Sequence, residues 1–137
     1  MLYSGGQLRQ KPGIHFVWSS ADFTGGPITS LSMWATSQFR EDNPRIYNAV
    51  LAAMHDAVDF IKTDPEKAAA IFIKKENSKL SPDFIAQVLR EPGLRFDLAP
   101  QRSVELAEFL ARTGLLKTKP DNWKDYFFPE IHMENGS

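Results

Sequence analysis

The chain has 137 residues, of which 42% are hydrophobic, 24% charged and 12% aromatic. This is the composition of an ordinary folded domain, which excludes a disordered, collagen-like or coiled-coil protein. The absence of cysteine excludes a disulfide framework, a thiolate nucleophile and a cysteine-ligated metal. The formal net charge of -1 provides no overall field that would attract nucleic acid or an anionic membrane.

The first 42 residues are rich in glycine, serine, threonine and aromatic residues, which favours strands and loops. Alternating side chains over residues 14–18 predict a short strand with one strongly apolar face. A second strand is expected over residues 28–35, and either of its two faces can be directed inward. Between them, the paired Gly25 and Gly26 predict a turn-rich loop over residues 21–27.

Four helices are expected in the remainder of the chain. Three of them begin where a polar residue precedes proline, at Pro44, Pro65 and Pro82, because such a pair caps a helix and starts it. The fourth spans about residues 100–112, with Gly114 in the position that needs left-handed geometry. The helix from Pro44 to about residue 62 carries one apolar stripe and is expected to be the central packing element. The stripe consists of Tyr47, Val50, Leu51, Met54, Val58 and Ile61.

Two features indicate that this layout is short of packing surface. Two or three short strands, including an extended segment over residues 94–98, cannot form the sheet that four helices normally cover. The aromatic tail over residues 123–131 is too apolar to be a free end, so we expect it to dock.

No catalytic group, metal site or cofactor is predicted. His55 and Asp59 are four residues apart on a helix and could touch one metal ion. They flank the apolar stripe, however, which favours a solvent-facing structural role. His15 and His132 have no partner at ligand spacing, and Gly25 and Gly26 precede a strand, where a phosphate-binding loop would need a helix.

Several runs of sequence occur in a recognisable order and spacing: PGIH from Pro12, GGPIT from Gly25, WATSQFREDNP from Trp34, DPE from Asp64 and WKDYFFPE from Trp123. In this order they resemble the C-terminal part of substrate-binding proteins of ABC importers, of the nitrate, taurine and sulfonate group. The resemblance covers residues from about 8 to about 132. It implies an α/β fold of the type II periplasmic binding protein, here a mostly helical fragment with two or three short strands and four main helices.

On that template, residues 1–42 are the strand and loop segment from the second lobe and the hinge crossing, and residues 43–137 are the C-terminal helical part of the first lobe. The resemblance implies a non-enzymatic solute-binding component, whose partners are a small polar or anionic solute and an ABC permease. It also implies a periplasmic or extracytoplasmic location, although the N-terminal residues lack a signal-peptide pattern. No contact with nucleic acid and no membrane span are expected.

The same template places the ligand beside the crossing strand. Hydroxyl groups and unhindered backbone amides suit an oxyanion such as a sulfonate, whereas the carboxylate of Asp22 suits an amine on a zwitterionic solute. The candidate ligand-binding residues are Ser20, Asp22, Gly26, Thr29 and Ser30. These residues equally suit a plain connection between strands. The alternative function is a small self-associating interaction domain without a small-molecule ligand, and open sheet edges would make a homodimer possible.

Overall fold

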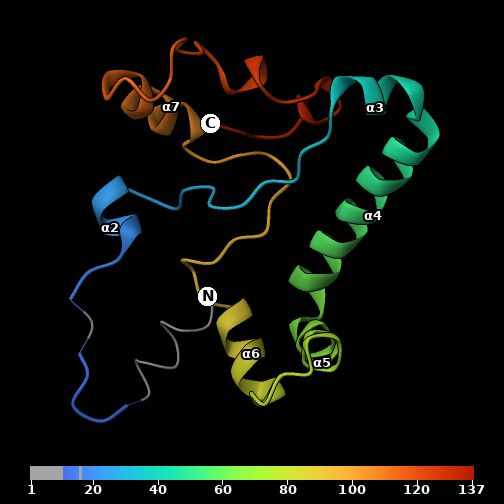
Figure 1. The fold of residues 1–137 in the computed structure, drawn as a ribbon. Helices are drawn as coiled ribbons and strands as arrows, with labels where there is room; N and C mark the ends of the chain where they lie inside the picture. The colour runs from blue at the N-terminus through green and yellow to red at the C-terminus, as the bar shows by residue number, and fades with distance from the viewer. Residues whose placement is uncertain (1–10, 16) are drawn as a thin grey trace.

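The computed structural model describes residues 11–15 and 17–137, and within them every regular element is a helix (Figure 1). The α-helices are α2 (Ser20–Thr24), α3 (Ser37–Asp42), α4 (Pro44–Thr63), α5 (Pro65–Glu76), α6 (Pro82–Leu89) and α7 (Ser103–Arg112). Two short 3₁₀ helices, η1 (Trp123–Asp125) and η2 (Pro129–Ile131), follow in the tail. No helix in the described ranges is both long enough and apolar enough to cross a membrane.

The four predicted main helices are confirmed, and two of their caps show why they begin where they do. The Asp64 carboxylate accepts a hydrogen bond from the backbone N–H of Lys67 at 3.0 Å. The Ser81 hydroxyl accepts one from the backbone N–H of Phe84 at 3.1 Å. Each bond satisfies an amide that the first helical turn leaves free. Helix α7 ends as expected, with Gly114 at a φ of +77°.

The predicted α/β fold is wrong, because no described residue belongs to a strand. Residues 28–35 and 94–98 are extended, but a strand also needs a ladder of hydrogen bonds to a neighbour. Figure 1 shows the extended segments running through the middle of the molecule without such a ladder. Among the described residues, no backbone bond joins these two segments; the Thr29 N–H donates instead to the carbonyl of Gln101, beyond the second segment, at 3.0 Å. The strand expected over residues 14–18 is likewise absent from its described residues, and residue 16 lies outside them.

Two short helices, α2 and α3, lie where the sequence predicts strands and loops. The expected turn over residues 21–27 contains α2, which a reciprocal pair of hydrogen bonds between Ser19 and Asp22 caps. Helix α3 begins after Thr36, whose hydroxyl accepts from the backbone N–H of Phe39 at 3.0 Å. Both helices are set by local side-chain capping in a stretch whose overall composition favours loops.

The buried residues form two separate clusters. In the first, α5 packs on α6 through Ala69, Ile85 and Ala86. In the second, Ala99 packs with Trp123 and Ile131 of the tail. Helix α4 runs along one side of the molecule, from α3 to α5 (Figure 1).

The aromatic tail docks on the chain itself, which confirms that it is not a free end. The ring of Phe128 meets Tyr47 of α4 edge-on, with centroids 5.8 Å apart. The Arg40 guanidinium lies 5.0 Å from the centre of the same ring and donates to the Glu130 carboxylate at 2.7 Å. These contacts fix the tail against α3 and α4. The division at residue 42 stays a prediction, and residues 1–10 of its first part lie outside the described ranges.

Candidate functional site

The loop predicted to bind ligand makes most of its polar contacts within the chain. Ser20 is the first residue of α2. The Asp22 carboxylate accepts from the backbone N–H of Ser19 at 2.7 Å and from its hydroxyl at 2.8 Å. These hydrogen bonds hold the pKa of Asp22 below its usual value. The carboxylate of Asp22 therefore has a local structural role as part of a helix cap.

Gly26 and its neighbour Gly25 allow the loop after α2 to approach the start of α7 closely. Their φ angles are +155° and +74°, in the region that favours glycine. The Arg102 side chain lies over both, and a Cβ atom added to Gly25 would come within 3.1 Å of the guanidinium. Arg102 Nε also donates to the Thr24 carbonyl at 3.1 Å. The two glycines thus let the loop after α2 rest against the start of α7.

Thr29 joins the loop to the second extended segment. Its hydroxyl accepts from the backbone N–H of Gln101 at 2.7 Å, in addition to the backbone bond between the same residues. Ser30 is exposed, and its hydroxyl makes a long bond of 3.4 Å to the Ile28 carbonyl. Ser30 is the predicted ligand residue whose side chain is least committed to the chain.

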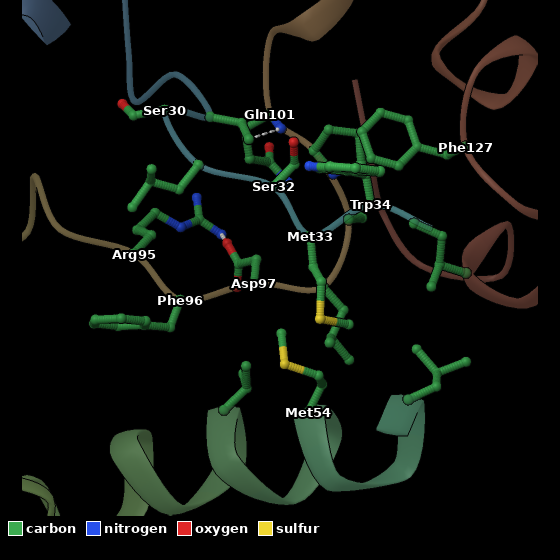
Figure 2. A pocket seen from close by; sticks show the side chains of 18 of the residues that line it. Ser30, Ser32, Met33, Trp34, Met54, Arg95, Phe96, Asp97, Gln101 and Phe127 are labelled. Carbon is green, nitrogen blue, oxygen red and sulfur yellow. Dashed lines mark hydrogen bonds and ion pairs between the residues drawn. The ribbon is translucent and has the colours of Figure 1, made fainter. Parts of the chain in front are cut away.

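An open cavity of about 510 Å³ lies between the two extended segments, the apolar face of α4 and the aromatic tail (Figure 2). Thr29 and Ser30 line this cavity, whereas Asp22 and Gly26 do not. Most of the lining is apolar, and Met33 and Met54 point toward each other across it (Figure 2). Five residues of the predicted α4 stripe also line it: Tyr47, Val50, Leu51, Met54 and Val58. The stripe therefore faces a partly open space, and only Val58 of α4 is buried.

Charged and polar groups gather at one part of the lining. Arg95 Nη2 lies 2.8 Å from Asp97 Oδ2, and Lys62 Nζ lies 3.1 Å from Asp97 Oδ1. Two cations thus neutralise one carboxylate. The Arg95 side chain remains 52% exposed, which leaves guanidinium N–H groups available to an anion. Ser32 and Gln101 are further polar residues of the lining, besides Thr29, Ser30 and Tyr47.

Few of the described residues in this lining are ionisable. Its described ionisable groups are Tyr47, Arg95 and Asp97. Burial, followed by the nearby Glu130 charge, raises the pKa of Tyr47 above its ordinary value, so its hydroxyl stays protonated at neutral pH. Asp97 is already paired with two cations. The lining therefore combines a large apolar surface with a few hydrogen-bonding groups, the usual makeup of a small-molecule pocket.

The predicted pair His55 and Asp59 lines a second, polar cavity of about 290 Å³. His55 is half-buried and Asp59 is exposed. No group of three or more histidine or acidic side chains in the described ranges is arranged to hold a metal ion. The pair thus lies beside the apolar stripe of α4, as its spacing in the sequence predicts.

Sequence reasoning missed four polar residues of the large cavity: Ser32, Arg95, Asp97 and Gln101. A signal for Arg95 was present, because the alternation over residues 94–98 places Arg95 and Asp97 on one side of an extended segment. Nothing in the sequence shows that this side meets residues 28–35.

No family model, curated protein or solved structure matches the chain.

Proposed function

We propose that the chain is the C-terminal part of a solute-binding component of an ABC importer, and that it contacts a small polar or anionic solute at the large cavity. The sequence resemblance supports the class. The cavity beside Thr29 and Ser30 supports the binding role most directly. Its volume of about 510 Å³ falls within the range of roughly 300–1,000 Å³ that small-molecule pockets occupy.

The lining favours a solute with an anionic head and an apolar body. Arg95 offers guanidinium donors to the head, and the hydroxyls of Ser30 and Ser32 offer two more. The surface of α4 and the methionine side chains would cover the body, and burial contributes about 0.8 kcal/mol per methylene group. An alkyl sulfonate matches this pattern better than nitrate, which has no apolar part.

This function involves no catalytic step, so the partners are the solute and the importer's permease. A periplasmic or extracytoplasmic site of action belongs to the same proposal. Binding by the 137-residue chain is testable by thermal shift with butanesulfonate, taurine and nitrate. A ligand present at 100 times its dissociation constant stabilises a protein by about 2.7 kcal/mol, so butanesulfonate is expected to raise the melting temperature most.

The matched variants for this test are Arg95→Gln and Arg90→Gln. Arg90 is 50% exposed and pairs with Glu66, away from the cavity, so it matches Arg95 in exposure. The stabilisation by butanesulfonate should be lost in Arg95→Gln and kept in Arg90→Gln. Equal melting temperatures with and without all three solutes would contradict the proposal.

One observation favours the second candidate, a self-associating interaction domain. Large apolar side chains of the cavity lining are exposed to solvent, among them Leu31 at 79% and Trp34 at 84%. Clusters of this kind mark interaction surfaces on soluble proteins. Self-association and solute binding are separate measurements, so each candidate can fail alone.

A further inference from the structure

The segment over residues 30–35 is an extended chain whose backbone has no hydrogen-bond partner among the described residues. In the described part of the molecule, no hydrogen bond joins the backbone N–H or carbonyl groups of these residues to another residue. The last backbone bond before the segment is at Thr29, and the next begins α3 at Thr36. Such a row of free donors and acceptors is a template for another extended chain.

The same segment lies at the edge of a large exposed apolar surface. The cavity lining includes side chains that are 42–84% exposed: Leu31, Met33, Trp34, Phe39 and Val50. Together they offer on the order of 600 Å² of apolar surface, given that one large aromatic side chain buries about 150–250 Å². A standard interface buries about 800 Å² per partner, of which roughly 57% is apolar. This face therefore has enough apolar area for a stable dimer.

We propose that residues 30–35 pair with the same residues of a second copy, as an antiparallel two-stranded ribbon about a twofold axis at Ser32. In an antiparallel pair, residues directly opposite each other point to the same face of the ribbon. A twofold axis perpendicular to the ribbon preserves this only if one residue lies directly opposite its own copy, and the axis then passes between these two copies. Centring on Ser32 places Leu31 of each copy opposite Met33 of the other. These are the apolar side chains of the segment that share one face.

The pairing accounts for both unusual features of the segment together. It supplies hydrogen-bond partners to the free backbone groups, and it covers apolar side chains that are otherwise in water. A globular partner without an extended edge would cover the side chains and leave the backbone groups unpaired. The inference deepens the second candidate function above, and it does not depend on solute binding.

A single cysteine at the axis tests the register, because the chain has no cysteine of its own. Opposite residues in an antiparallel pair have Cα atoms about 4.5–5.5 Å apart, within the range of about 4.4–6.8 Å that a disulfide spans. Ser32→Cys is therefore expected to form a covalent dimer rapidly under mild oxidation with copper phenanthroline. Ser30→Cys is the matched control, since the two copies of residue 30 would lie roughly 13 Å apart.

Sedimentation of the unmodified chain at about 1–100 µM should show a dimer, and the Ser32→Cys variant should crosslink at least tenfold faster than Ser30→Cys. Leu31→Lys should weaken the dimer at least tenfold, whereas Leu115→Lys should not, because Leu115 is 76% exposed outside the cavity lining. A monomer at 100 µM would overturn both the pairing and the second candidate function. A dimer with equal crosslinking rates, or one indifferent to Leu31→Lys, would overturn the pairing alone.

If Leu31→Lys fails to fold, hydrogen exchange on the unmodified chain tests the strand pairing instead. The amides of residues 30–35 should become protected as the concentration rises through the dimerisation range, because pairing gives them acceptors. Amides that exchange at the same rate in monomer and dimer would refute strand pairing.

Discussion

Replacing Trp123 by alanine should destabilise the protein more than replacing any exposed aromatic residue. Trp123 is 6% exposed and lies at the centre of the cluster with Ala99 and Ile131. Its ring contacts Phe127 and His132 edge-on, with centroids 6.0 and 5.6 Å away. Gly136 lies so close to the ring that an added Cβ atom would come within 2.6 Å of it. The indole therefore holds both the 3₁₀ tail and the last residues in place.

The expected cost is about 3–5 kcal/mol, the usual range for a buried tryptophan replaced by alanine. A domain of ordinary stability has only about 5–15 kcal/mol in total, so this variant should be close to unfolding. Trp18→Ala is the control, because Trp18 is 63% exposed and its ring meets only Phe23 among the described aromatic rings. Urea unfolding followed by circular dichroism gives both free energies. A loss below 1 kcal/mol in Trp123→Ala, or equal losses in the two variants, would refute this description of the core.

Three further substitutions test other parts of the structure. His55→Ala should change the free energy of unfolding by less than about 0.5 kcal/mol, because His55 is half-buried and makes no hydrogen bond to another described residue. Gly25→Ala should cost about 1–3 kcal/mol in urea unfolding, from its φ of +74° and the contact with Arg102. Arg40→Gln should flatten the fall in stability below about pH 4. Burial is the largest single influence and raises the pKa of Glu130, but the hydrogen bond and the charge of Arg40, together with a backbone hydrogen bond, outweigh it and hold the pKa below its ordinary value.

The sign of the pH effect follows from linkage. A carboxyl group with a lowered pKa in the folded state stabilises the protein above its unfolded pKa, and this stabilisation is lost as the pH falls through the folded pKa. The unmodified protein should therefore lose more stability than Arg40→Gln between pH 5 and pH 3. Parallel urea-stability profiles for the two proteins over that interval would show that the ion pair is not formed.

The main helices could be predicted because their signals are local. Pro44, Pro65 and Pro82 each follow a polar residue, and helix starts depend on residues within one turn. The apolar spacing of α7 would place Leu106 inward, yet Leu106 is 39% exposed, because little of the described chain covers that side of the helix.

The strands could not be predicted correctly, because a strand exists only with a neighbour. Residues 28–35 have the alternation and the extended backbone of a strand, and the sequence does not show that the described chain supplies no ladder for them. The ligand residues divide for a similar reason. Asp22 was predicted to bind ligand because it is polar, but its carboxylate caps α2. Gly26 was predicted because its backbone is unhindered, but it allows the close approach of Arg102. The role of Arg95 depends on segments about 60 residues apart that meet at one cavity.

The most direct test of the proposed function is calorimetric titration of the 137-residue chain with butanesulfonate, alongside Arg95→Gln and Arg90→Gln. The proposal predicts saturable binding to the unmodified chain, at least tenfold weaker binding to Arg95→Gln, and unchanged binding to Arg90→Gln. The absence of binding heat with the unmodified chain, or equal affinities for the two variants, would contradict a solute site at this cavity.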